Sequence, residues 1–430
     1  MDWMARPPTF REACRFWCKL GFISFGGPTG QIAIMHTELV DRKKWIDESH
    51  FLHALNYCML LPGPEATQLA TYCGWLLHGT WGGIVAGALF VLPSVVLLWA
   101  LSWIYVAHGN VPWIAAIFYG LKPAVTAIVA VAVIKIGRRA LKQAWLWAVA
   151  AAAFVAIFFF RAPFPVIIAA AGLLGLAASR WSRSGAVSPM ITSTRRVESD
   201  RPANRATWIR AARVMAVCVS LWAAPVLAAG MLLGWDHVLV REGVFFSKAA
   251  MVTFGGAYAV LPYVGQEAVE SFGWLTAAQM VDGLGLAETT PGPLIMVVQF
   301  VGFLGAWHQP APMTPLAAAT LGAAITTWTT FVPCFLWIFL GAPYVERLRD
   351  SRRLSGALTA VTAAVVGVVL NLAVWFALQV LFQRAPGMPR VDWFAVVVAA
   401  AAFVALQREK VGVVGVVLGA GLLGLAWRLL

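Results

Sequence analysis

The chain has 430 residues, of which 60% are hydrophobic and only 12% are charged, and its mean hydropathy is +0.77. Because a soluble surface needs more polar groups than this, the composition excludes most soluble folds, and it equally excludes a disordered or fibrous chain. The net charge of +13 would suggest nucleic acid on a soluble protein, but here the basic residues cluster between apolar runs. We therefore expect an all-α polytopic membrane protein that binds no nucleic acid, with its basic clusters in cytoplasmic loops.

In chain order, the N-terminal segment Met1 to Arg15 lacks an apolar core followed by a small-residue cleavage site, so we do not expect a signal peptide. Two segments are then interrupted by helix-breaking residues, Phe25-Gly26-Gly27-Pro28 and Pro62-Gly63-Pro64. Later apolar runs are long enough to cross a bilayer as helices, which takes about 20 residues. These predicted spans are 81–107, 113–136, 143–160, 164–179, 214–235, 314–341, 354–383, 391–407 and 411–428.

A polar segment rich in Ser and Arg, residues 181–207, divides the chain near its middle. We predict an N-terminal repeat over 1–180, a cytoplasmic linker over 181–207 and a C-terminal repeat over 208–430. The six cysteines have no zinc-site spacing, and we expect no metal, no cofactor and no catalytic residues.

The two predicted halves share a sequence repeat. Phe25-Gly26-Gly27 recurs as Phe254-Gly255-Gly256, a shift of 229 residues (254 − 25), and Pro62-Gly63-Pro64 recurs as Pro291-Gly292-Pro293 at the same shift. The register also matches rarer residues, pairing Trp45 with Trp274. Agreement of paired Pro and Trp at one register indicates a duplicated unit.

Loop charges predict that the two halves have opposite orientations. The first half has Arg42-Lys43-Lys44 where the second has the uncharged Ser271-Phe272-Gly273. The next connection reverses this, because 108–112 is uncharged whereas 345–353 carries four arginines. Basic residues favour the cytoplasmic side, so equivalent loops of which only one is basic belong on opposite sides of the membrane, as in inverted-topology repeats. The span near 214–235 would invert the second half. Only one net crossing then fits between 44 and 108, so the Pro-Gly-Pro segments are expected to be re-entrant.

A broken helix at membrane depth has free backbone groups that must face protein or a water-filled cavity. A helix that starts just after such a break directs N–H groups and its positive dipole end at that cavity, which favours an anion. Two inverted copies would bring four such ends together. A tetrahedral oxyanion can accept several N–H bonds at once, whereas the alternative is a set of packing kinks without a ligand.

Side chains near the breaks are candidate ligands of this anion. Lys19 and Lys248 each lie six residues before a Phe-Gly-Gly motif and could offset a dianion, or alternatively extend to the lipid headgroups. Glu65 and Glu288 flank the Pro-Gly-Pro motifs without counterparts in the other half, and are candidates for proton coupling or helix capping. The remaining candidates are hydroxyl and amide groups at the breaks: Thr29, Thr67, Gln68, Tyr258, Thr290 and Gln299.

At these motifs the sequence resembles the chromate ion transporter (CHR) family, in its long two-domain form. The resemblance rests on Lys19 to Gln31 (KLGFISFGGPTGQ), Leu61 to Gly74 (LPGPEATQLATYCG) and their second-half counterparts, and it covers nearly the whole chain. It implies a bacterial inner-membrane protein that exports chromate and confers chromate resistance, with halves of opposite orientation. Sulfate is a structural mimic of chromate, so the alternative is a transporter of sulfate or another anion.

Other classes of function have less support. The chain has no Walker-type phosphate loop, so a transporter of this sequence would use ion gradients. It also has no HExxH or Gly-x-Ser-x-Gly motif, which argues against an enzyme. Paired broken helices in inverted repeats favour alternating access over a passive channel. The sequence leaves open the coupling ion, the preference between chromate and sulfate, and the oligomeric state.

Overall fold

The structure, a computed structural model, describes residues 8–25, 27–109, 111–181, 205–341, 352–383, 390–408 and 411–429. The predicted linker 181–207 and the arginine-rich segment 345–353 lie largely outside these residues, and Gly26 lies outside them as well.

The first half is a series of helices that follows the sequence prediction closely. They are α1 (Phe10–Ile23), α2 (Gly27–His36), η1 (Thr37–Arg42), α3 (Glu48–Cys58), α4 (Glu65–His108), α5 (Pro112–Ala140), α6 (Ala144–Phe160) and α7 (Phe164–Trp181). Helix α8 (Arg205–Leu233) follows, at the position of the predicted extra span.

The second half repeats this order of elements. They are α9 (Val238–Val252), α10 (Ala257–Gln266), η2 (Glu267–Ser271), α11 (Ala277–Thr289), η3 (Leu294–Met296), α12 (Val297–His308), α13 (Pro315–Gly341), α15 (Arg352–Leu381), α16 (Trp393–Gln407) and α17 (Val413–Leu429). The two-residue strands β1 (Phe382–Gln383) and β2 (Arg390–Val391) pair between α15 and α16.

Local sequence explains why equivalent helices start at equivalent places. Asp47 caps α3 by accepting a hydrogen bond from His50 N, and Thr276, at the equivalent position 229 residues later, caps α11 by accepting from Gln279 N. Both halves also have a π-helical turn, η1 and η2, directly after the second helix. In η1, Glu38 pairs with Arg42 at 2.7 Å, as expected of a structural acid. The duplicated sequence therefore gives duplicated local structure.

Helix α4 contains a sharp reversal. His78 and Gly79 have non-helical dihedral angles, with φ of +62° at Gly79, and Gly74 packs directly against Gly82 and Ala86. Residues so far apart meet only if the two parts of α4 form an antiparallel hairpin, because a straight helix would separate them by about 1.5 Å per residue. In the second half, α12 and α13 form the corresponding hairpin, with Gly302 packed against Gly322.

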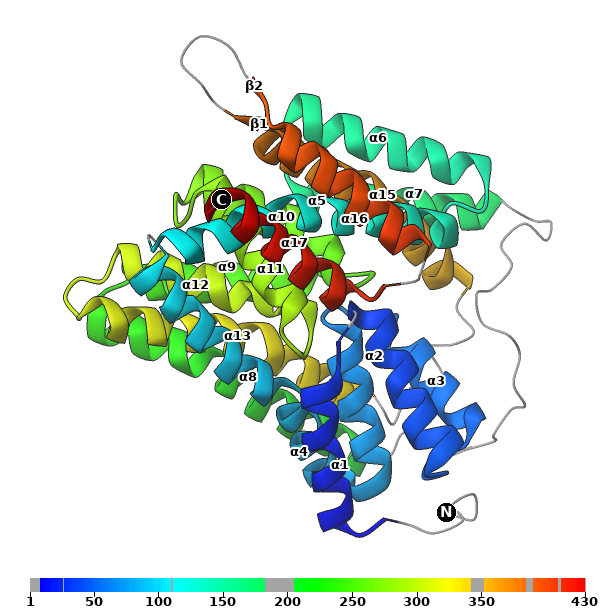
Figure 1. The fold of residues 1–430 in the computed structure, drawn as a ribbon. Coiled ribbons are helices and arrows are strands. Elements are labelled where there is room, and N and C mark those ends of the chain that lie inside the picture. The colour runs from blue at the N-terminus through cyan, green and yellow to red at the C-terminus, as the bar shows by residue number, and fades with distance from the viewer. Residues whose placement is uncertain are drawn as a thin grey trace.

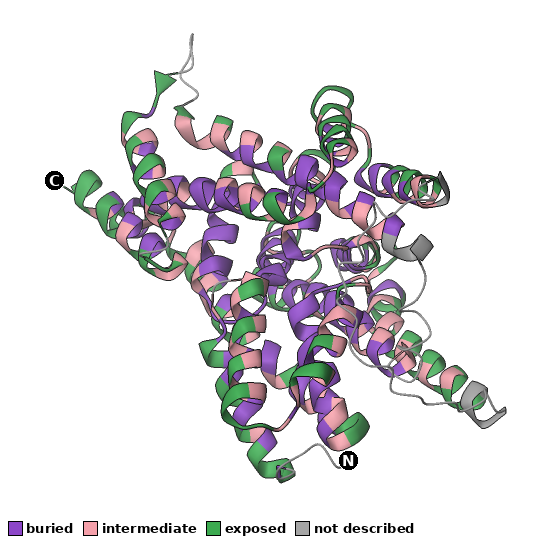
Figure 2. Ribbon diagram, turned by 90° about the vertical axis from the view of Figure 1, so that its right-hand side faces the viewer, coloured by how far each residue is buried: buried purple, intermediate pink, exposed green. Residues whose placement is uncertain are grey.

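The two halves are interlocked rather than side by side. Helix α5 of the first half packs against α16 and α17 of the second, and α15 of the second half packs against α6 and α7 of the first. These helices gather in the upper part of Figure 1, while the C-terminal part of α4 crosses the helices of the second half. Buried residues concentrate along the middle of the molecule, and exposed ones lie on outward faces (Figure 2).

The chain is an all-α polytopic membrane protein. Among the described residues, five helices are long and apolar enough to cross a membrane. They are Glu65–His108, Pro112–Ala140, Ile209–Leu233, Pro315–Gly341 and Gly356–Leu381. Many of their large apolar side chains are exposed, such as Leu92, Val96 and Leu321, which is the arrangement expected where lipid replaces water.

Candidate functional site

Four short non-helical segments lie at the predicted helix breaks, and a helix follows each of them directly. Helix α2 begins at Gly27 and α4 at Glu65, whereas α10 begins at Ala257 and the continuous η3–α12 segment at Leu294. The first N–H groups of a helix have no partner inside that helix and carry the positive end of its dipole. The chain therefore has four helix starts of the kind that binds an oxyanion.

A reciprocal pair of backbone hydrogen bonds joins the breaks of one half to those of the other. Gly63 N donates to Thr253 O at 2.7 Å, and Gly292 N donates to Ser24 O at 2.8 Å. Gly292 is the equivalent of Gly63, and Thr253 is the equivalent of Ser24, at the 229-residue shift. Each Pro-Gly-Pro break is thus fixed to the residue just before the Phe-Gly-Gly motif of the other half. The amide groups of both glycines are used in this contact and are not available to a ligand.

Each break glycine also faces a side chain of the other half. A Cβ at Gly292 would lie 2.7 Å from Ser94 Cβ on α4, and a Cβ at Gly63 would lie 3.2 Å from Cys334 Sγ on α13. Their φ angles are +109° and +121°, a region that favours glycine. Glycine is therefore required at both positions for its conformation as well as for the close approach.

Side-chain amides support the same breaks. Gln31 Nε2 donates to Gly292 O at 2.5 Å, and Gln68 Nε2 donates to Pro62 O at 2.8 Å. Several buried polar atoms here have no hydrogen-bond partner among the described residues: Gln31 Oε1, Thr67 Oγ1, Gln68 Oε1 and Ser94 Oγ. Since buried polar atoms are nearly always paired, these atoms are candidates for hydrogen bonds to a polar ligand or water.

Two buried carboxyl groups lie in the first and last turns of the helices that flank the breaks. Glu65, in the first turn of α4, has its Oε1 3.9 Å from the position of a Cβ on Gly256, so it reaches the Phe-Gly-Gly motif of the other half. Glu288, near the end of α11, accepts a hydrogen bond from Tyr258 Oη at 2.5 Å. Burying an ionised carboxylate is costly without such partners, so these acids are candidates for protonation changes.

Comparison with known proteins supplies the family. The family model described as chromate transporter matches residues 11–176 and 242–425, one stretch in each half. The chain belongs to the chromate transporter family. This membership makes it a membrane transport protein rather than an enzyme.

Relatives of this chromate transporter family member match over most of their length. The chain is 32% identical over 423 residues to the chromate transport protein of Pseudomonas aeruginosa, covering 97% of this chain and 92% of that protein. It is 29% identical to the chromate transport protein of Cupriavidus metallidurans, over 85% of this chain and 82% of the relative. An uncharacterised transporter of Methanocaldococcus jannaschii is 26% identical, over 84% and 83% respectively. No solved structure matches the chain.

The two lysines predicted near the site of this chromate transporter family member lie on outward faces. Lys19 on α1 and Lys248 on α9 are both exposed. Their neighbours one turn on, Phe22 and Met251, are exposed apolar residues at equivalent positions. A lysine on such a face can bury its stem along apolar surface while its amine reaches water.

Other predicted ligands make contacts within the protein. Gln299 Nε2 donates to Val95 O at 2.8 Å and its Oε1 accepts from Thr327, so it links α12 to α4 and α13. Thr290, directly after α11, donates from Oγ1 to Ala287 O in the last turn of that helix. Thr29 is exposed and accepts from Arg139 at 3.4 Å. The remaining predicted residues are the break residues themselves, which are buried or half-buried: Phe25, Gly27, Pro62, Gly63, Pro64, Phe254, Gly255, Gly256, Pro291, Gly292 and Pro293.

Sequence reasoning missed three buried polar groups. Gln31 lies within the first motif. Ser94 follows Pro93 as Cys334 follows Pro333, and comparing the two halves beyond the Pro-Gly-Pro motifs would have found this match. Glu242 on α9 is fully buried against Gly305 and Gly322, and neither of its oxygens has a hydrogen-bond partner among the described residues. It has no counterpart at the 229-residue shift, where the first half has Ala13.

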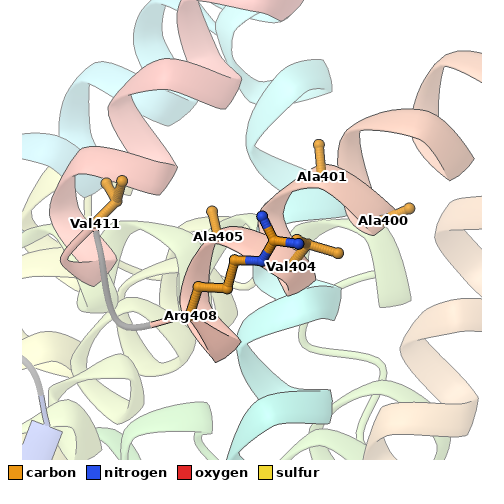
Figure 3. Close-up of a pocket in the computed structure, with 6 residues that line it drawn as sticks. All are labelled: Ala400, Ala401, Val404, Ala405, Arg408 and Val411. Carbon is orange, nitrogen blue, oxygen red and sulfur yellow. The ribbon is translucent and has the colours of Figure 1, made fainter.

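A separate surface pocket of about 570 Å³ lies along the C-terminal part of α16 and the connection that follows it (Figure 3). Its lining is alanine and valine with a single charged residue, Arg408. None of its residues comes from the four breaks, so it does not belong to the site described above. Among the described residues, no group of three or more His, Cys, Asp and Glu side chains could hold a metal ion.

Proposed function

We propose that this protein is a secondary transporter that exports chromate across the bacterial inner membrane and thereby confers chromate resistance. The observation that carries the proposal is the reciprocal contact Gly63–Thr253 and Gly292–Ser24, which ties the four breaks into two matched cross-half pairs. Its relatives in Pseudomonas aeruginosa and Cupriavidus metallidurans are named chromate transport proteins, which supports chromate as the substrate.

In this proposal the anion binds between the broken helices of the two halves. Chromate is a tetrahedral dianion, and the helix starts at Gly27, Glu65, Ala257 and Leu294 would direct N–H groups at its oxygens. The hydroxyl groups of Thr67 and Ser94 are buried, have no hydrogen-bond partner in the described part of the chain, and would donate two further hydrogen bonds. Lys19 and Lys248, being exposed, would attract the anion over a distance rather than contact it.

The halves would work as inverted repeats with re-entrant Pro-Gly-Pro segments. Opposite basic load on equivalent loops supports the inversion, and the odd helix α8 between the halves supplies the extra crossing that it requires. In other transporters, such repeats give alternating access around a fixed midplane site. Glu65 and Glu288, whose side chains reach Gly256 and Tyr258 at the second Phe-Gly-Gly motif, are the proposed proton-coupling groups.

Sulfate is the alternative substrate, because it has the same shape and charge as chromate and would bind the same donors. Uptake of labelled chromate into inverted membrane vesicles tests both possibilities. We expect saturable uptake that changes when a proton gradient is imposed or collapsed and that excess sulfate inhibits only partly. Absence of chromate uptake with strong sulfate uptake would transfer the function to sulfate, and absence of both would contradict the proposal.

A further inference from the structure

A cluster of titratable side chains lies between the two halves, outside the four breaks. Lys122 Nζ on α5 lies 3.4 Å from Asp282 Oδ2 on α11, and Tyr105 Oη on α4 donates to the same oxygen at 2.9 Å. The Asp282 side chain is only 4% exposed, whereas that of Lys122 is 27% exposed. The lysine and the tyrosine belong to the first half and the aspartate to the second, so the contact crosses the interface between the halves.

The two carboxyl oxygens of Asp282 are in different situations. Oδ2 receives both contacts, while Oδ1 is buried and has no hydrogen-bond partner among the described residues. A purely structural ion pair in a low-dielectric interior normally has its remaining lone pairs satisfied, because an unmade hydrogen bond is costly there. Asp282 instead retains one bare oxygen, which is where a proton binds to a carboxylate.

Few other charged groups surround this carboxyl. The elements that pack on α11 are α4, α5, α12, α15, α17 and η3. Besides Tyr105 and Lys122, α4 carries Glu65, Tyr72, His78 and His108, and α5 carries Tyr119, Lys135, Arg138 and Arg139. Helix α12 ends at His308. Helix α17 carries Arg428 near its end, where it lies over the Tyr119 ring. The part of α15 from Gly356 to Leu381 has no titratable side chain, and neither has η3. Among the described residues, Lys122 is the cation that forms an ion pair with Asp282.

The position of Asp282 connects it to the site. Helix α11 runs from Asp282 to Glu288, six residues and about 9 Å further on, and then into the break at Gly292. Gly285, between the two acids, packs on Val125 of α5, so α5 follows α11 along this stretch. The equivalent residue in the first half is His53, so both repeats have a titratable side chain at this position.

We infer that Asp282 is a proton-binding site at the interface between the halves, with Lys122 as its counter-ion and Tyr105 as the donor that orients it. The inference rests on the proposed anion transport and adds to it a third acid that links proton binding to movement of the two halves. When Asp282 is ionised, Lys122 attaches α5 to α11 through it. When a proton occupies Oδ1, that attraction is weakened and α5 can shift relative to α11.

The test measures two activities in the same vesicles that contain the full chain. One is chromate transport driven by an imposed proton gradient, and the other is exchange of labelled for unlabelled chromate without a gradient. We expect Asp282→Asn to lose the gradient-driven activity and to keep the exchange. As a matched control, Asp236→Asn removes an exposed aspartate that lies 3.7 Å from Arg241, and should leave both activities unchanged.

A double variant separates the proton site from a structural ion pair. If the pair is only structural, Asp282→Asn combined with Lys122→Gln removes both charges and restores gradient-driven transport, which would overturn the inference. If Asp282 binds the proton, the double variant keeps exchange and remains insensitive to the gradient.

Tyr105→Phe provides a variant that retains both charges, in case Asp282→Asn fails to insert. It should shift the pH profile of gradient-driven transport, and an unchanged profile would also overturn the inference. If the wild-type protein shows no chromate exchange, the proposed anion transport itself is contradicted.

Discussion

The two halves of this protein share their backbone contacts but differ in their chemistry. Gly63 and Gly292 make the same cross-half hydrogen bond, from the same position after equivalent helices. Around them, the first half has Glu65 where the second has Leu294, and the second half has Glu288 where the first has Met59. The side chains facing the glycines differ too, as Cys334 in one pair and Ser94 in the other.

This difference separates two requirements of a transport site. Backbone donors at helix starts depend on the fold, and a duplicated fold provides them twice. Acids that change protonation are needed only where coupling occurs, so they can diverge between the repeats. The interpretation predicts that changes to the shared backbone reduce transport itself, while changes to Glu65 or Glu288 alter the pH dependence of transport.

The largest expected effect concerns the orientation of the halves. In a background with Cys14, Cys18 and Cys218 replaced by serine, we expect Arg42→Cys and Ser271→Cys to be labelled from opposite faces of the membrane. The two positions are equivalent at the 229-residue shift, and both are exposed. Labelling with a membrane-impermeant thiol reagent in right-side-out and inverted vesicles gives the measurement. Labelling of both from one face would contradict inverted repeats.

The next effect concerns the break glycines. Gly292→Ala should reduce chromate transport more than Gly63→Ala, because its Cβ would lie 2.7 Å from the helical Ser94 Cβ. At Gly63 the nearest atoms are the ends of flexible side chains, Gln68 Nε2 at 3.0 Å and Cys334 Sγ at 3.2 Å. Backbone strain alone costs about 1–2 kcal/mol, which corresponds to roughly a tenfold loss if it acts on the transport step. Transport assays of equal amounts of inserted protein provide the measurement.

Two variants control for the cause of that loss. Gly255→Ala has the same kind of strain, with φ of +80°, but no atom within 4 Å of the new Cβ, so it reports strain without a clash. Ser94→Gly removes the clash together with a proposed ligand hydroxyl, so the double variant Ser94→Gly with Gly292→Ala is compared with Ser94→Gly alone, and its further loss should be no larger than that of Gly255→Ala. Full activity of Gly292→Ala would contradict the close cross-half contact.

A smaller, more selective effect is expected of the acids. Glu65→Gln and Glu288→Gln should each make chromate transport less dependent on pH, because neither amide can bind a coupling proton. Tyr258→Phe keeps Glu288 but removes its hydrogen-bond donor, so it should shift the pH profile without flattening it. Transport rates across a pH series provide the measurement. Unchanged profiles in both glutamine variants would remove these acids from the coupling mechanism.

The smallest effect is expected of the outward lysines. Lys19→Ala and Lys248→Ala should impair chromate transport modestly without affecting insertion, because both side chains are exposed and act on the anion at a distance. The loss should diminish as salt screens the charge, since the screening length is about 10 Å at 0.1 M salt. Normal efflux in both variants at low salt would show that these lysines do not attract the anion.

The sequence by itself determined the membrane class, the helix positions and the duplication. Apolar runs such as 113–136 and 143–160 became α5 and α6 with only small changes at their ends, because helix length in a bilayer is fixed by local composition. The Gly and Pro motifs likewise marked all four breaks, since their backbone constraints act within a few residues.

Only the tertiary structure decided how these pieces meet. It showed that the Gly63 and Gly292 amides are taken up by the other half, and that Lys19 and Lys248 lie on outward faces. It also paired Lys122 with Asp282 and buried Glu242 between glycines. The physical reason is that these contacts join residues far apart in sequence, through packing of helix faces across the two halves. No periodicity or spacing along the chain records which face meets which.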